Sequence, residues 1–291
     1  MNLKESFEKK RFVVTSEIQV PLTDEEPGGE QSLDRIKGRV DGLSVQETEF
    51  EGVVTDTIKT CSLLKQNNFN AIYQTTTRDK NRFQLQKDLT QAHETGVENL
   101  LVFTEDYRIT GDSLQESMFF HVDSGKIASV LDLLKKGETV EGDSLDKQIE
   151  FVLGSGIETP WGRTMPKRGM EEMEDMLNVG AGYFLTTPIF DVDQFSKFMK
   201  QVDPFRVPVI AEVMILRTAG MGKFLNRHFK SGLVPDWVIQ KLMKAPDKER
   251  ASMELFADTV NSLKDVCQGI HIITIGGVDN LVPYLNAAKL R

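Results

Sequence analysis

A (β/α)8 barrel in a single domain, spanning residues 1–291, is the fold class that the sequence predicts. Short apolar runs alternate with amphipathic stretches along most of the chain, and eight of the runs have the composition of strands. The competing fold, an open doubly wound sheet, usually carries a Gly-x-Gly-x-x-Gly motif after its first strand. Val20-Pro-Leu-Thr-Asp contains no such motif, so the barrel is favoured.

The predicted strands are short runs rich in β-branched and aromatic residues. They cover residues 11–20, 39–45, 69–76, 99–104, 149–153, 183–187, 207–213 and 269–274.

The predicted helices have apolar residues at helical spacing or recognisable end signals. Leu85, Leu89 and Ala92 form one apolar stripe, Gly96 stops that helix, and Asp191 is in an N-cap position. The helices are expected at residues 32–37, 55–65, 79–96, 126–136, 169–179, 191–202, 221–229, 235–243, 249–266 and 279–289.

Residues 107–147 break this rhythm. We interpret the stretch as an insertion, an extended loop with an extra helix over the top of the barrel, where specificity is often built. Gly154-Ser-Gly156 follows the fifth predicted strand. A tight turn is the favoured interpretation of these glycines, and a phosphate-binding loop is a weaker one.

Composition narrows the class of protein. A net charge of -9 argues against nucleic acid or an anionic membrane as the main partner. The two cysteines, Cys61 and Cys267, are far apart and fit a reducing cytoplasm. The charged N-terminus lacks the apolar segment of a signal peptide, and no apolar run approaches the roughly 20 residues of a membrane span. A cytoplasmic protein is therefore expected.

Glu17 is the first candidate for chemistry because it lies in the apolar run 11–20. Burying an unpaired carboxylate is unfavourable, so the side chain needs either a partner or a function. Glu105 and Asp106 follow another apolar run. Two acidic strand ends favour a site at the carboxyl end of a barrel, where such enzymes keep their chemistry, although pairing with a basic residue for structure alone is the alternative.

The histidines do not suggest a metal centre. His93, His121, His228 and His271 are scattered, and the motifs of zinc proteases are absent from the sequence. His271 lies inside the eighth predicted strand and is expected to be a hydrogen-bonded barrel residue rather than a catalyst.

Several segments, in their order along most of the chain, resemble the methylenetetrahydrofolate reductases, flavin-dependent (β/α)8 enzymes of one-carbon metabolism. Residues 179–192, Val-Gly-Ala-Gly-Tyr-Phe-Leu-Thr-Thr-Pro-Ile-Phe-Asp-Val, are the most similar. The other similar segments are residues 14–21, 75–82, 96–106, 207–210, 234–237 and 269–274.

The resemblance implies an oxidoreductase that interconverts the methylene and methyl forms of tetrahydrofolate, or of a related reduced pterin, by hydride transfer from a flavin, FAD or FMN. Glu17 would be the general acid that protonates the folate amine. Asp106 would lie between flavin and pterin, as a catalytic and substrate-binding residue, and Thr187 would contact the substrate. The implied cofactor-binding residues are Tyr73, Thr75, Thr104, Glu105, Arg163, Lys167 and Arg168.

The chain departs from the family pattern at three places. Glu105 replaces a glycine, Thr187 replaces a substrate-binding glutamine, and residues 171–176 are acidic where the family has basic residues for the flavin phosphates. An acidic helix face repels a pyrophosphate. FAD in the family manner, FMN, a rearranged FAD and no flavin therefore all stay open.

Two further functions stay open beside the reductase: a flavin-poor, pterin-binding partner subunit, and a pterin-dependent methyltransferase of a corrinoid system. The expected partners of a reductase are a reduced folate and an electron donor, either a nicotinamide or a partner redox protein. An oligomer or a complex is expected, with neither nucleic acid nor a membrane as partner.

Overall fold

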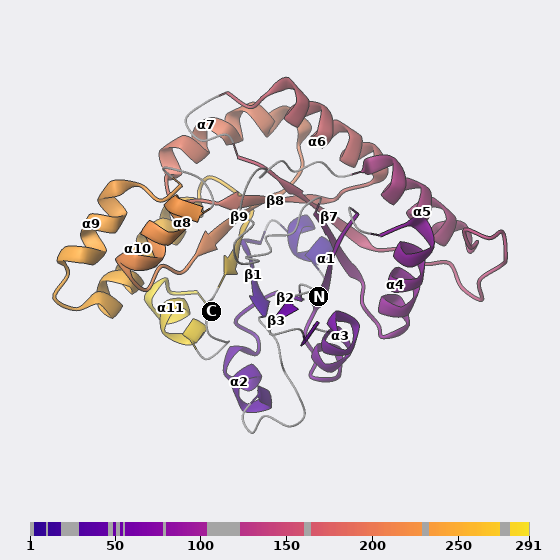
Figure 1. Cartoon of the computed structure of the whole chain (residues 1–291), viewed down its shortest axis with the longest axis horizontal. Coiled ribbons are helices and arrows are strands. Elements are labelled where there is room, and N and C mark those ends of the chain that lie inside the picture. Colours follow the sequence, from indigo (N-terminus) through magenta and orange to yellow (C-terminus); the bar gives the residue numbers. More distant parts are fainter. Residues whose placement is uncertain are drawn as a thin grey trace.

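The computed structural model describes residues 3–9, 11–18, 29–45, 49–50, 53–54, 56–77, 80–103, 123–159, 164–228, 233–273 and 280–290. Eight parallel strands close into a barrel in the order β1-β10-β9-β8-β7-β6-β5-β2, which confirms the predicted fold class. Figure 1 shows most of the helices around the outside of the strands, with α1 in the middle of the view. The barrel strands are Val13–Ile18 (β1), Gly42–Val45 (β2), Ala71–Thr76 (β5), Asn99–Phe103 (β6), Val152–Ile157 (β7), Tyr183–Pro188 (β8), Val209–Met214 (β9) and Gly269–Ile273 (β10).

The two remaining strands, Glu49–Phe50 (β3) and Val53–Val54 (β4), pair antiparallel in a small separate sheet that the sequence did not predict. Strands of two residues are too short to produce a visible alternation of polar and apolar side chains.

The helices follow the predicted order, and several begin at a side-chain cap. Asp56, Asn81, Asp123, Asp191 and Asp247 each accept a hydrogen bond from a backbone N–H of the first turn. Within the described residues, no helix has the length and the apolar run needed to cross a bilayer. The helices are Leu3–Glu8 (α1), Gly29–Ile36 (α2), Thr57–Gln66 (α3), Arg82–Glu94 (α4), Ser124–Lys136 (α5), Lys167–Val179 (α6), Val192–Val202 (α7), Asp203–Phe205 (η1, 3-10), Ala219–His228 (α8), Asp236–Lys244 (α9), Lys248–Leu263 (α10) and Leu281–Ala287 (α11).

Helix α5 corrects the prediction that the helix within residues 107–147 lies over the top of the barrel. It packs between α4 and α6 in the outer ring (Figure 1), as the helix that connects β6 to β7. Its buried side chains, Ile127, Val130 and Leu134, lie on one helical face and join the main core. The loop predicted at 107–122 lies outside the described residues.

Gly154 and Gly156 correct a second prediction, because they lie inside β7 rather than in a turn after it. Aromatic rings of the neighbouring strands lie directly against them. A Cβ atom on Gly156 would be 2.5 Å from Cδ1 of Phe103, and one on Gly154 would overlap the ring of Tyr183. Glycine is therefore required here by the close approach of a side chain and not by a turn.

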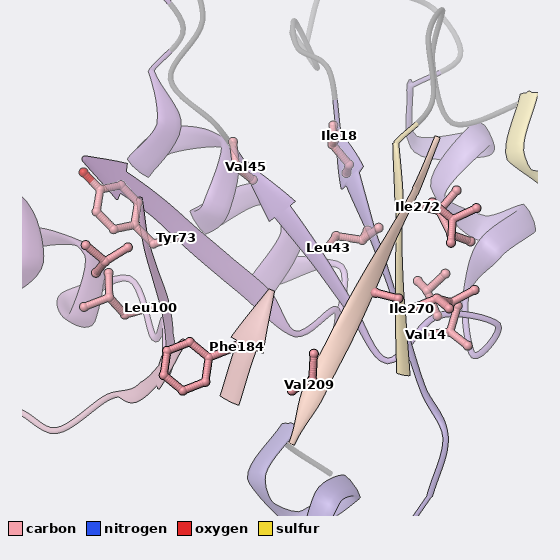
Figure 2. Close-up of a cluster of buried hydrophobic side chains, with 14 of the residues drawn as sticks. Val14, Ile18, Leu43, Val45, Tyr73, Leu100, Phe184, Val209, Ile270 and Ile272 are labelled. Carbon is pink, nitrogen blue, oxygen red and sulfur yellow. The ribbon is translucent and has the colours of Figure 1, made fainter. Parts of the chain in front are cut away.

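The apolar core has one layer on each side of the strands, and a third cluster packs among helices α8, α9 and α10. Val14, Leu43, Leu100, Phe184 and Ile270 belong to the outer layer, between the strands and the helices (Figure 2). The inner cluster fills the barrel below its middle and includes Leu3 of α1, a helix that the sequence did not predict. Helix α1 thus closes the amino-terminal end of the barrel. The buried members of the inner cluster are Leu3, Val13, Ile72, Leu101, Phe103, Tyr183, Leu185 and Ile210.

We expect Gly156→Ala to lower the free energy of unfolding by about 1–3 kcal/mol, because the added methyl group overpacks the barrel against Phe103. Gly182→Ala is the matched control, since a Cβ there would meet only the Leu153 carbonyl oxygen at 3.7 Å. Urea unfolding of both variants measures the difference. Equal midpoints for the two variants would contradict the proposed close approach.

Candidate active site

The inner surface of the barrel brings two glutamates to the same level. Glu212 on β9 is in register with His271 on β10, and His271 is in register with Thr15 on β1. Because side chains alternate along a strand, the next inward residue of β1 after Thr15 is Glu17. In a barrel of this type one layer is built from alternate strands, staggered in this way. Glu17 and Glu212 therefore share a layer.

The same stagger holds in the other direction around the barrel. Glu17 is in register with Ser44 of β2, which is in register with Ile72 of β5, and the next inward residue is Gln74. The same step, across two strands in register and then to the next inward residue, leads from Gln74 to Gly156 of β7. A further step leads from Gly156 to Glu212 of β9. We call these four positions the polar layer: Glu17, Gln74, Gly156 and Glu212.

His271 lies in the layer below and is held by two hydroxyl groups. Its Nδ1 is 2.8 Å from Thr15 Oγ1, and its Nε2 is 3.4 Å from Ser44 Oγ. Burial lowers the pKa of His271 to about 4, so the ring is neutral near pH 7. This placement agrees with the prediction that His271 is a hydrogen-bonded barrel residue, and it means that the ring brings no positive charge to the glutamates.

Burial controls the ionisation of both glutamates. It raises the pKa of Glu17, which is partly exposed, to about 7. The pKa of Glu212, which is only 3% exposed, is raised well above its usual value, first by burial and then by the charge of Glu17. Among the described residues, Oε1 of Glu212 has no hydrogen-bond partner. The polar layer therefore disfavours the ionised form of both carboxyl groups.

Thr187 lies on β8 near the polar layer, where the strand is irregular. The register between β8 and β9 shifts between Leu185 and Pro188, and the Glu212 N–H donates to Thr186 Oγ1 at 3.1 Å. The Thr187 hydroxyl is hydrogen-bonded to the Thr159 hydroxyl, and the Thr159 N–H donates to it at 3.3 Å. The predicted substrate residue thus has a local partner that holds it in place.

Tyr73 and Thr75, which the family resemblance implies as cofactor-binding residues, do not lie with the polar layer. They alternate with Gln74, so their side chains face away from the barrel interior. Tyr73 lies beside Leu100 in the outer core layer (Figure 2), and burial raises the pKa of its hydroxyl to about 12. The inward residue of this strand is Gln74.

Lys167 and Arg168 occupy the first turn of α6, whereas the sequence analysis placed the helix start just after them. The Lys167 Nζ is 3.3 Å from Glu171 Oε1, and the Arg168 Nε is 2.9 Å from Glu172 Oε1. Pro166 precedes the helix and provides no side-chain cap. The helix start therefore carries two exposed cations and uncapped backbone N–H groups, with carboxylates one turn away.

The remaining predicted site residues, Thr104, Glu105, Asp106 and Arg163, lie outside the described residues. Glu212 and Gln74 were not among the predicted site residues. Both are polar residues within apolar strands, the same signal that singled out Glu17. In the part of the chain that the structure describes, no group of three or more histidine, cysteine, aspartate or glutamate residues could hold a metal ion.

Comparison with known proteins identifies a family. The sequence profile of the family described as methylenetetrahydrofolate reductase matches residues 2–282. A search of curated proteins found no match.

Similar solved structures share the fold at low identity. Phosphonopyruvate hydrolase in complex with oxalate and Mg++ matches with a TM-score of 0.55 and 11% identity, over 99% of this chain and 85% of that one. EDTA monooxygenase from Chelativorans sp. BNC1 gives 0.53 and 10%, over 97% and 95%. A 2,3-dimethylmalate lyase gives 0.52 and 10%, over 93% and 79%.

We expect Glu17→Gln to remove a pH dependence of stability. Unfolded glutamate has a pKa near 4.5 and folded Glu17 one of about 7, so the folded state binds more protons between these values. The stability contributed by Glu17 is fully present below about pH 4.5 and is lost as the pH rises to about 7. The loss is about 1–3 kcal/mol once partial exposure is allowed for.

Urea unfolding at pH 5 and pH 8 tests this expectation. Glu17→Gln should gain stability relative to the native chain at pH 8 and less at pH 5. The control is Glu174→Gln, on the exposed side of α6, which should change neither value. An equal effect of Glu17→Gln at both pH values would mean that Glu17 keeps an ordinary pKa in the fold.

Proposed function

Because this chain belongs to the methylenetetrahydrofolate reductase family, a family of folate-related oxidoreductases, we propose that it interconverts the methylene and methyl forms of a reduced folate or related pterin. The observation that carries the proposal is the polar layer, and above all Glu17. A carboxyl group that is partly exposed at the upper part of a barrel, with a pKa of about 7, is suited to deliver a proton at neutral pH.

Glu17 acts as the general acid. Its carboxyl group transfers a proton to the bridging amine nitrogen of the methylene-folate, which weakens the carbon–nitrogen bond and opens the bridge to an electrophilic iminium. A group that titrates near the working pH is protonated often enough to act and acidic enough to give up the proton. Gln74, in the same layer, supplies an amide group that can orient the ring of the substrate.

Two features of the described residues support a flavin. Polar groups of the barrel layer lie where a ring could be placed over the carboxyl end, and the uncapped start of α6 with Lys167 and Arg168 suits a phosphate. We propose that Lys167, Arg168 and Arg163 hold the phosphates of FAD or FMN. When bound, the flavin supplies the hydride that the one-carbon unit accepts.

We propose roles for the other predicted site residues as well. Asp106, with Thr104 and Glu105, would contact the flavin and the pterin, and Thr187 would contact the substrate through the hydroxyl that Thr159 positions. The flavin would receive its electrons from a nicotinamide or from a partner redox protein, the latter within a larger complex.

A second function is favoured by one observation. Lys167 and Arg168 are already paired with Glu171 and Glu172, and a pyrophosphate would have to displace or tolerate these carboxylates. A chain that binds the reduced pterin without its own flavin, as a partner subunit, would keep Glu17 and lose the phosphate site. The absorbance spectrum of the purified protein separates the two functions, because only the reductase carries a flavin of its own.

We expect Glu17→Gln to lower the rate of methylene-folate reduction by about 100-fold or more, the usual contribution of a general acid. Flavin content and folate binding should persist, because the amide has the size of the acid. Stopped-flow oxidation of the reduced protein by methylene-folate measures the rate, with Glu174→Gln as the control. A rate within about twofold of the native value would remove Glu17 from the mechanism.

We expect Lys167→Gln combined with Arg168→Gln to weaken flavin binding about tenfold, because two cations are lost at the phosphates. Glu171→Gln combined with Glu172→Gln should strengthen it, since the paired carboxylates disappear and the cations stay. Fluorescence titration with FAD and with FMN at two salt concentrations gives the affinities. If neither pair of substitutions changes them, the phosphates bind elsewhere.

A further inference from the structure

The interior of the barrel contains a carboxyl group that the reaction of Glu17 leaves unused. Glu212 is 3% exposed, and its Oε1 has no hydrogen-bond partner among the described residues. A buried polar atom without a partner is unfavourable and calls for an explanation. The strand register places Glu212 in the same layer as Glu17, separated around the barrel only by β10.

We propose that Glu212 and Glu17 form a carboxyl dyad, in which Glu212 stays protonated and donates a hydrogen bond to Glu17 whenever Glu17 is ionised. Glu212 is then a positioning residue that acts through Glu17. The inference rests on the proposed role of Glu17 as general acid for its catalytic consequence, but the dyad itself is a property of the free protein.

Among the residues that the structure describes, no group around the dyad offers another source of neutralisation. On β10, His271 is neutral and held by Thr15 and Ser44. On β8, Leu185 and Thr187 are the inward residues near this level, and on β5 the inward residue is Gln74. Within the described residues, neither glutamate forms an ion pair with a basic side chain. Two carboxyl groups that share such a site cannot both ionise readily, so they hold a common proton.

The proton balance of the reaction follows from this arrangement. The O–H bond of Glu17 breaks as the folate nitrogen gains the proton, and the electron pair stays on the Glu17 carboxylate. The Glu212 hydroxyl keeps its own proton and stabilises that carboxylate by a hydrogen bond. Water at the open end of the barrel then returns a proton to Glu17, which is the more exposed of the two. The pair therefore carries one negative charge at most during turnover.

Two substitutions of Glu212 separate this role from simple space filling. Glu212→Gln keeps a hydrogen-bond donor but cannot ionise, whereas Glu212→Leu fills the site without a donor. We expect Glu17 to titrate in Glu212→Gln within about half a pH unit of its native value. In Glu212→Leu its pKa should rise by about one unit, because the carboxylate loses its donor.

The titration is measured by carbon-13 NMR of side-chain carboxyl groups in glutamate-labelled protein without substrate, with Glu17→Gln and Glu212→Gln identifying the two signals. The native protein should show two coupled steps, and Glu212→Gln only the lower one. Identical Glu17 titrations in the Gln and Leu variants would overturn the dyad. Should Glu212→Leu not fold, Glu212→Met provides the variant without a donor.

The pH profile of the reduction rate then tests the catalytic consequence. The alkaline limb, where Glu17 loses its proton, should move up by about one unit in Glu212→Leu and stay in place in Glu212→Gln. A purely structural role of Glu212 would lower the rate at every pH without moving the limb. If Glu17→Gln proves fully active while the coupled titration is present, the proposed function fails and the dyad stands.

Discussion

The stagger of the closed barrel is the constraint on which the site depends. Eight parallel strands can close only with a fixed displacement between neighbours, and this displacement decides which inward side chains share a level. It brings Glu17 and Glu212 together although they are distant in sequence. No loop or helix is needed for their encounter. A carboxyl pair on strands is consequently held more rigidly than one on surface loops would be.

The position of the pair also lowers the stability of the fold, because a charge inside the barrel is poorly solvated. Burial of apolar side chains elsewhere in the barrel offsets this loss of stability. The levels below the glutamates are filled by Ile72, Leu101, Leu185 and Ile210, and α1 closes the end with Leu3. The outer layer, between strands and helices, forms the largest core cluster of the structure. The apolar material is concentrated at one end of the barrel, and the polar residues gather toward the other, where barrel enzymes carry out their chemistry.

The barrel could be predicted from the sequence because the order of strands and helices stays the same when the predicted bounds of an element are wrong by a few residues. The sequence did not predict which side chains of a strand point into the barrel and which point toward the helices. A strand buried on both sides is apolar throughout, so nothing in its composition separates inward from outward residues. A displacement of one residue exchanges the faces, so the composition of this strand does not show that Gln74, rather than Tyr73 or Thr75, is its inward residue. The prediction of a turn at Gly154 and Gly156 was wrong for a related reason. A glycine that makes room for an aromatic ring of a neighbouring strand cannot be distinguished, in the sequence alone, from a glycine in a turn.

Glu212 shows that strand register is needed in addition to composition to predict this site. It lies in an apolar strand, as Glu17 does, but only the register reveals that the two meet. Among the described residues of the interior, burial lowers the pKa of His271 to about 4 and raises that of Glu212 well above its usual value. Of these groups Glu17, with a pKa of about 7, is the one that changes its charge near neutral pH. A carboxyl group that titrates near the working pH can both hold and deliver a proton, which is what acid catalysis on a folate amine requires.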